Sequence, residues 1–310
     1  MWRALTALAC LCLSLASATA ATTPTWFDWH ASENGAHPVY HADGFTLTLG
    51  SRPSKGGGPP TPTLTIQSPG RKLLTLAGSQ AYDDPAALVG VVRLDAASPS
   101  PQVLFMTYSG GAHCCTWLQV AIPTRGGWLR RDLSYDGDPE KEILGAPLSG
   151  VPTLVIPDGA FDYTFASHAG SWPALRLYVV RDGALVDVSD ERRFSAFHGE
   201  QAAKSLAACR TSTERNGACA AYVAEMALAG DYKAAWTNML AAYDPKGELW
   251  FPTGCRTTAD PCPKTDQLPF RDFPHALDWF LWRYGYHPLA PDVVCTRSNC
   301  PVTPAGVFRP

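Results

Sequence analysis

The chain has 310 residues, of which 46% are apolar and 17% are charged. Its 26 glycines and 27 prolines are too few for a collagen-like or fully disordered chain, and the length fits one large domain or two medium ones with a real core. The formal net charge of −3 gives no general attraction to nucleic acid or to anionic lipid, so neither is expected as a partner.

The first 20 residues have the pattern of a secretory signal peptide. Arg3 supplies a positive start, an apolar run extends from residue 4 to 16, and small residues follow at Ala18 and Ala20. The run is too short to span a membrane, and no later segment has the pattern of a transmembrane helix. Cys10 leaves a lipoprotein anchor as an alternative. We expect a soluble protein that is periplasmic or secreted after cleavage near Ala20.

Residues 21–44, which follow the leader, are expected to be irregular. They include His30, His37 and His41, for which a metal site and exposed loop positions are the alternatives. From residue 45 to 188, short runs rich in β-branched and aromatic residues alternate with turns, which predicts antiparallel β structure. The Asp182-Gly183 pair predicts a tight hairpin. The expected strands are 45–49, 63–66, 72–76, 88–94, 103–107, 117–122, 128–133, 153–156, 161–165, 175–180 and 184–188.

Near residue 195 the apolar period changes to that of helices. Ala-rich segments at 201–208 and 218–229 predict two helices; Gly230 is expected to end the second and Asp231 to cap the next, which extends to about residue 243. Another helix is expected after Asp272, with Pro274 in its first turn. The predicted class is therefore α+β. The expected units are a signal peptide (1–20), an antiparallel β domain (21–195; a sandwich, a barrel or propeller-like blades), a smaller disulfide-stapled helical region (196–290) and a Pro-rich tail with a disulfide loop (291–310).

Eight cysteines lie outside the leader, and in an oxidising compartment an even number predicts disulfide bonds. Short separations favour the local pairs Cys209–Cys219, Cys255–Cys262 and Cys295–Cys300, each stabilising by about 2–3 kcal/mol. Zinc is the alternative, but no C-x2-C pair is present. The eight are Cys114, Cys115, Cys209, Cys219, Cys255, Cys262, Cys295 and Cys300.

Oxygen-bearing side chains recur at every second position from residue 132 to 140, and Gly137 permits a sharp turn. Such alternation suits a hard cation, Ca²⁺ above all, although the EF-hand glutamate and flanking helices are missing. With the trailing Gly145-Ala146-Pro147, the segment resembles the calcium loop of an integrin-type FG-GAP propeller repeat, in a single clear copy. An acidic turn without metal is the alternative. The resemblance implies side-chain ligands at Asp132, Ser134, Asp136 and Glu140 and a carbonyl ligand at Asp138.

The segment Ser109-Gly110-Gly111-Ala112-His113-Cys114-Cys115 lies between two strong strands. It resembles a segment of bacterial exported proteins of unknown function, which implies no activity. Three alternatives stay open. Cys114 and Cys115 form a vicinal disulfide, or His113 activates a thiolate at Cys114, or the cysteines pair with distant partners or stay buried.

Standard catalytic motifs are absent: there is no G-x-S-x-G, H-E-x-x-H, S-x-x-K or P-loop. Asp158 and Asp162 are either an acid/base pair or surface turn residues. Among the aromatic residues at 279–286, Trp282 and Tyr286 are the pair expected to be exposed, where they could form a platform for a glycan or a peptide.

These patterns together predict an exported, non-catalytic binding or interaction protein, with calcium stabilising one loop and an unidentified protein or glycan as its ligand. The alternative is a thiol-dependent enzyme or redox protein that uses Cys114 and Cys115 with His113. Enzymatic activity is left open, with the motifs weighing against it.

Overall fold

The computed structural model describes residues 23–54, 56–79, 84–95, 97–110, 115–145, 148, 150–247, 252–257 and 261–287. The predictions for the leader, for His113 and Cys114 and for the tail with Cys295 and Cys300 lie outside these residues. Within the described ranges, no helix combines the length and the apolar character needed to cross a bilayer.

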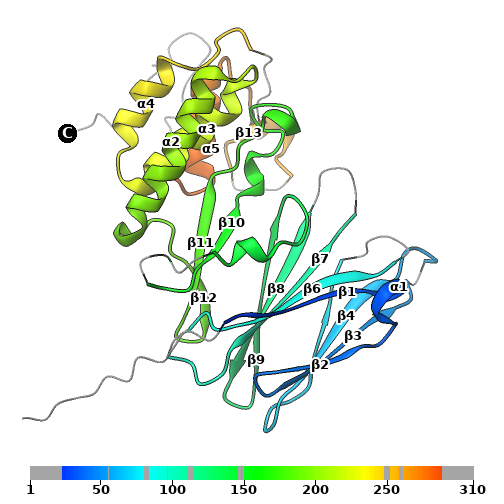
Figure 1. Cartoon of the computed structure of the whole chain (residues 1–310). Coiled ribbons are helices and arrows are strands. Elements are labelled where there is room, and N and C mark those ends of the chain that lie inside the picture. Colours follow the sequence, from blue (N-terminus) through cyan, green and yellow to red (C-terminus); the bar gives the residue numbers. More distant parts are fainter. Residues whose placement is uncertain are drawn as a thin grey trace, which may run out of the picture.

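Two antiparallel sheets make up the first half of the chain (Figure 1). A five-stranded sheet has the order β1-β6-β7-β8-β9 and a four-stranded sheet the order β2-β3-β4-β5. Trp29, Leu47, Leu64 and Phe105 from the two sheets are fully buried in one shared core, so the sheets pack face to face and do not close into a barrel. The strands are β1 (Thr25–His30), β2 (Val39–Ala42), β3 (Phe45–Arg52), β4 (Thr61–Gln67), β5 (Leu74–Ala77), β6 (Ala86–Val92), β7 (Gln102–Tyr108), β8 (Thr116–Thr124) and β9 (Gly127–Tyr135).

The five-stranded sheet is covered on both faces. Val89 and Phe105 face the core shared with the four-stranded sheet, whereas Leu88 and Leu104 belong to a second core with residues of the next sheet. That third sheet consists of β10 (Leu154–Pro157), β11 (Leu175–Arg181) and β12 (Ala184–Asp187). Burial on both faces explains why β6 and β7 are apolar almost without interruption.

The turn between β11 and β12 confirms the predicted hairpin. Asp182 and Gly183 have φ values of 52° and 73°, and the strands pair directly on either side of them. A two-residue hairpin with both central residues at positive φ matches the twist of the flanking strands.

The short helix α1 lies between β1 and β2, whereas the other helices follow the third sheet and cover its far end (Figure 1). Gly230 ends one helix in the left-handed conformation, at φ 95°, and the Asp231 carboxylate accepts a hydrogen bond from the Ala234 N–H, so both predicted boundaries are confirmed. Asp272 caps the last helix in the same way, with Pro274 in its first turn. The helices are α1 (Ala31–Asn34), α2 (Ser195–Thr211), α3 (Arg215–Ala229), α4 (Tyr232–Leu240) and α5 (Phe273–Arg283).

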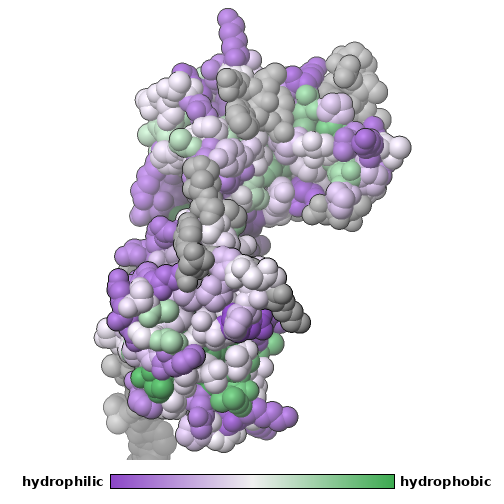
Figure 2. All heavy atoms as spheres, turned by 90° about the vertical axis from the view of Figure 1, so that its right-hand side faces the viewer, coloured by the Kyte–Doolittle hydropathy of each residue, from purple (hydrophilic) through white to green (hydrophobic). Residues whose placement is uncertain are grey.

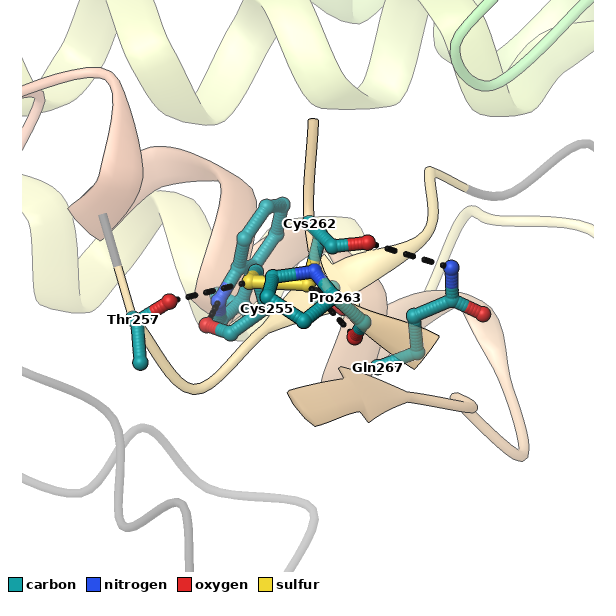
Figure 3. The surroundings of a disulfide bond; sticks show 7 residues. Cys255, Thr257, Cys262, Pro263 and Gln267 are labelled. Atoms are coloured by element: carbon teal, nitrogen blue, oxygen red, sulfur yellow. Dashed lines mark hydrogen bonds between the residues drawn. A yellow bond between two sulfur atoms is a disulfide. The ribbon is translucent and has the colours of Figure 1, made fainter. Parts of the chain in front are cut away.

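Two predicted disulfides hold the helical region. Cys209–Cys219 joins the end of α2 to α3, and Cys255–Cys262 closes a loop beside β13 (Gly254–Cys255) and β14 (Gln267–Leu268). Figure 3 shows the second bond, with the Gln267 side-chain amide donating to the Cys262 carbonyl at 3.5 Å. The Trp279 indole N–H donates to the Cys255 carbonyl at 3.4 Å, which ties this loop to α5.

Two expectations for the β region are wrong. Residues 21–44 were expected to be irregular, but residues 25–30 and 39–42 form strands β1 and β2. These strands form because β6 and β3 pair with them, and their own sequence pattern does not predict this. Residues 161–165 do not form a strand. The Asp158 carboxylate accepts a hydrogen bond from the Ala160 N–H and starts the turn η2 (Gly159–Phe161), whose Phe161 packs edge-on against Phe280 of α5.

Candidate functional site

The two segments singled out from the sequence meet at one end of the five-stranded sheet. β8 and β9 pair so that Thr116 lies opposite Tyr135, which places Cys115 next to the residues that follow β9. The Thr116 hydroxyl donates to the Gly137 carbonyl at 2.6 Å, and the Glu140 N–H donates to the Tyr135 hydroxyl at 3.4 Å. These contacts hold the acidic loop against the end of the sheet.

Cys115 is disulfide-bonded, and its partner lies outside the described residues, because the other described cysteines pair with one another. Its backbone is fixed by Ser109, whose hydroxyl accepts from the Cys115 N–H at 2.7 Å and whose N–H donates to the Cys115 carbonyl at 3.0 Å. A sulfur in a disulfide is not a thiolate nucleophile, so in this state Cys115 offers no thiol chemistry. Whether Cys114 and His113 act as a nucleophile and its base stays a prediction.

The acidic segment is split between a strand and a loop. Asp132 and Ser134 lie within β9, where the Asp132 carboxylate forms a salt bridge with Arg130 at 2.8 Å and accepts from the Gln119 side chain at 3.4 Å. Asp138 and Glu140 are exposed beyond the end of the strand. Two of the five expected calcium ligands thus lie on the strand, and the other three lie beyond its end. Calcium binding by them stays a prediction.

Asp136 instead approaches two residues that follow β10. Of the residues that the structure describes, one group of His, Cys, Asp and Glu side chains has three ligand atoms within 4.8 Å of one another, and it consists of Asp136, Asp162 and His168. His168 Nδ1 is 2.8 Å from Asp162 Oδ1 and 3.8 Å from Asp136 Oδ2. Asp162 directly follows η2, and His168 begins η3 (His168–Gly170).

A pocket of about 440 Å³ lies where β9, the third sheet and the end of α5 meet. Ser134 and Asp158, which line it, are close in sequence to Asp136 and Asp162. Figure 2 shows that the molecular surface is hollowed where the sheet-rich and helical lobes meet, with hydrophilic side chains on both lobes. The pocket is lined by Leu133, Ser134, Ile156, Pro157, Asp158, Gly159, Arg176, Tyr178, Asp187, Tyr284 and Gly285.

Arg176 organises the floor of the pocket. Its Nε lies 3.2 Å from the Asp158 carboxylate, its Nη2 donates to the Tyr284 carbonyl, and its guanidinium lies 3.9 Å from the centre of the Tyr286 ring. The Tyr286 hydroxyl donates to Asp158 at 2.8 Å. Burial works against the charge of Arg176, but Tyr286, Asp158 and Asp187 outweigh it and raise its pKa, so Arg176 stays charged. Asp158 is therefore held by Arg176 and Tyr286, and its action with Asp162 as an acid/base pair stays a prediction.

Two tyrosines at the site, Tyr178 and Tyr286, have raised pKa values. Burial, reinforced by the charge of Asp187, raises the pKa of Tyr178 to about 12. Burial likewise raises the pKa of Tyr286 well above its usual value. At neutral pH both hydroxyls can therefore donate hydrogen bonds.

The expectation that Tyr286 is exposed is wrong, because its ring packs between Arg176 and the edge of Phe161, 5.6 Å from the latter ring. Trp282 is partly buried against the helical core. Tyr284, which is 44% exposed, is the aromatic residue that reaches the surface at the pocket. Arg176 and His168 carried no motif and were missed by sequence reasoning.

A family model described as the sll0997 C-terminal domain matches residues 198–285, which hold α3 to α5 and most of α2. The chain is 34% identical over 231 residues to a protein of Synechocystis sp. named "Probable thylakoid lumen protein sll0997", covering 73% of this chain and 68% of that one. It is also 29% identical over 282 residues to "Uncharacterized protein y4bJ" of Sinorhizobium fredii, of which it covers 42%. No solved structure matches the chain.

None of these descriptions mentions a propeller repeat, and the matched domain lies outside the acidic segment at 132–140. The FG-GAP resemblance therefore stays a prediction. The similarity to the Synechocystis protein extends over more than two thirds of both chains. This chain belongs to the sll0997 family.

Proposed function

We propose that this chain is an exported, non-catalytic binding protein that recognises a glycan unit at the pocket between β9, the third sheet and the end of α5. Export is supported by two observations. The Synechocystis relative is named as a lumenal protein, and each described cysteine is disulfide-bonded, as expected outside a reducing cytosol.

The observation that carries the binding role is the pocket itself. Its volume of about 440 Å³ suits a small ligand, and apolar walls at Leu133 and Ile156 surround a few convergent polar groups. Those groups come from separate parts of the chain. Arg176 and Tyr178 lie on β11, Asp187 on β12 and Ser134 on β9, so the folded protein assembles them in advance.

The character of the polar groups favours a ligand with many hydroxyls. Arg176 and Asp158 neutralise each other at 3.2 Å, and the planar Arg176 guanidinium has N–H groups besides those that it gives to Asp158 and the Tyr284 carbonyl. Tyr178 adds a neutral phenol, and the half-exposed Tyr284 ring adds a flat apolar face at the rim. Fixed donors and acceptors next to an aromatic face can bond the hydroxyls of a sugar while its ring stacks.

Calorimetric titration with a panel of soluble mono- and disaccharides tests this proposal. We expect at least one saccharide to bind at one site per chain, and Tyr284→Ala to weaken that binding about ten-fold by removing the rim ring. The matched control is Tyr163→Ala, because Tyr163 is also 44% exposed and does not line the pocket. No binding by any saccharide, or equal loss in both variants, would overturn the glycan assignment.

The thiol-based alternative has its own measurement. A thiol titration of the mature protein, purified without reductant and unfolded in denaturant, should detect no free thiol if the chain is a disulfide-stapled binding protein. A reactive thiol that disappears in Cys114→Ser would favour the alternative, in which Cys114 and His113 carry the activity.

A further inference from the structure

We propose that Asp136, Asp162 and His168 bind a divalent cation of the borderline class, such as Zn²⁺. The three residues come from two connections of the chain: Asp136 follows β9, whereas Asp162 and His168 both lie between β10 and β11. Their ligand atoms nevertheless lie within 4.8 Å of one another. This site is independent of the glycan pocket and does not require that proposal to hold.

The distances suit a shared ion. Ligand atoms that each lie about 2.1 Å from a tetrahedral zinc are about 3.4 Å from one another. His168 Nδ1 lies 2.8 Å from one carboxylate oxygen and 3.8 Å from the other, which brackets that spacing. A cation placed between the three groups would take one ligand atom from each of them.

The donor set selects the class of ion. One imidazole nitrogen and two carboxylate oxygens are ligands that zinc and similar divalent transition metals share. Calcium prefers six to eight oxygen ligands, and an imidazole nitrogen is a poor substitute for one of them. The same Asp136 that the sequence pattern placed in a calcium loop thus belongs to a site with different chemistry.

The group is both accessible and supported. The side chains of His168, Asp136 and Asp162 are 36%, 22% and 19% exposed, so an ion can enter and water can complete its coordination. The buried Tyr135 precedes Asp136, and the buried Phe161 precedes Asp162, so each carboxylate is anchored to a packed core. A bound ion would join the end of the five-stranded sheet to the segment that packs on α5.

Equilibrium titration of the mature protein, made without a histidine tag and stripped with chelator, tests the proposal with Zn²⁺, Co²⁺ and Ca²⁺ as probes. We expect one Zn²⁺ per chain, with Ca²⁺ about a hundred-fold weaker. His168→Gln and Asp136→Asn should each weaken Zn²⁺ binding about ten-fold or more and abolish the visible absorption of bound Co²⁺. Zn²⁺ should raise the melting temperature of the parent protein and not that of either variant.

The matched control is Asp132→Asn, which changes an acidic residue of the same segment that is engaged with Arg130 and lies outside the cluster. It should bind Zn²⁺ as the parent protein does. Circular dichroism without metal checks that each variant is folded, and the two cluster variants alter different loops, so a single misfolded variant leaves the test standing. Zn²⁺ binding that persists in both cluster variants would overturn the proposal. So would Ca²⁺ binding tighter than Zn²⁺ that is lost in Asp132→Asn, which would instead favour the calcium loop.

Discussion

His198 and His168 each contact a carboxylate through Nδ1, but their surroundings differ. The side chains of His198 and Glu225 are fully buried, with Nδ1 and Oε2 2.6 Å apart, whereas His168 is 36% exposed beside Asp162 and Asp136. Glu225 also accepts a hydrogen bond from the Leu175 N–H at 2.7 Å, so the buried pair joins α2, α3 and β11. Similar chemistry thus has two consequences: in the interior it fixes the packing of elements, and at the surface it is open to a ligand.

The strongest test of this contrast is Glu225→Ala. The substitution removes the partner of His198 and of the Leu175 N–H inside the core, and we expect a loss of about 3–5 kcal/mol in the free energy of unfolding. Urea unfolding measures it. Glu225→Gln, which keeps hydrogen-bonding atoms at the same position, should lose less. A loss below about 1 kcal/mol for Glu225→Ala would show that the buried His198–Glu225 pair contributes no more to stability than an exposed pair does.

The next effect concerns the disulfide between α2 and α3, the two helices that His198 and Glu225 also join. Replacing Cys209 and Cys219 together by serine opens a loop with a sequence separation of 10 residues, and we expect a loss of about 2–3 kcal/mol. Urea unfolding of this double variant, compared with that of the parent protein under reducing conditions, measures it. Should the variant and the reduced parent both match the oxidised parent in stability, the buried pair alone would hold the two helices.

A third histidine–carboxylate contact, Asp272 with His275, lies between the two extremes, with side chains 32% and 12% exposed. Burial opposes the charge of Asp272, but hydrogen bonds and the charge of His275 outweigh it and lower the pKa of the carboxyl. Because the pKa of Asp272 is lower in the folded than in the unfolded state, its ionised carboxylate stabilises the fold above about pH 4. This contribution is lost as the pH falls through the folded-state pKa.

Asp272→Asn keeps a capping acceptor for α5 but removes the charge, and we expect it to cost about 0.5–1 kcal/mol at neutral pH. Because the carboxyl becomes protonated in acid, the difference between the parent and the variant should shrink below about pH 4. Unfolding curves measured from pH 7 down to pH 3 check this. A difference that stays constant over that range would exclude the charge as its cause.

The smallest expected effect belongs to the exposed group. Without metal, His168→Gln should change the free energy of unfolding by less than about 0.5 kcal/mol, because hydrogen bonds and ion pairs at the surface contribute little. Urea unfolding in the presence of chelator measures it. A loss as large as that of Glu225→Ala would place His168 among the residues that hold the fold together and would remove the contrast.

Local features of the structure could be predicted from the sequence. Gly230, Asp231 and Asp272 act on backbone groups within a few residues of themselves, and the Asp182-Gly183 turn is set by its own dihedral angles. The disulfides Cys209–Cys219 and Cys255–Cys262 close short loops, so proximity along the chain was sufficient to pair them.

Features that depend on distant pairing could not be predicted in this way. β1 forms because it pairs with β6, and the sequence of residues 25–30 has no periodic pattern that predicts this strand. His168 meets Asp136 across 32 positions of the sequence, and Arg176 reaches the Tyr284 carbonyl across 108. The alternating oxygens at 132–140 suggested a self-contained loop, but β9 extends to Tyr135 and separates Asp132 from the residues beyond the strand.

The double covering of the five-stranded sheet has a consequence for how the protein opens. β7 lies at the centre of that sheet, with Phe105 in one core and Leu104 in the other. Its amide hydrogens cannot meet solvent unless β6 or β8 separates from it and both cores are breached at once. In deuterated solvent, the amides of β7 should therefore be among the last to exchange, at a rate set by unfolding of the whole molecule.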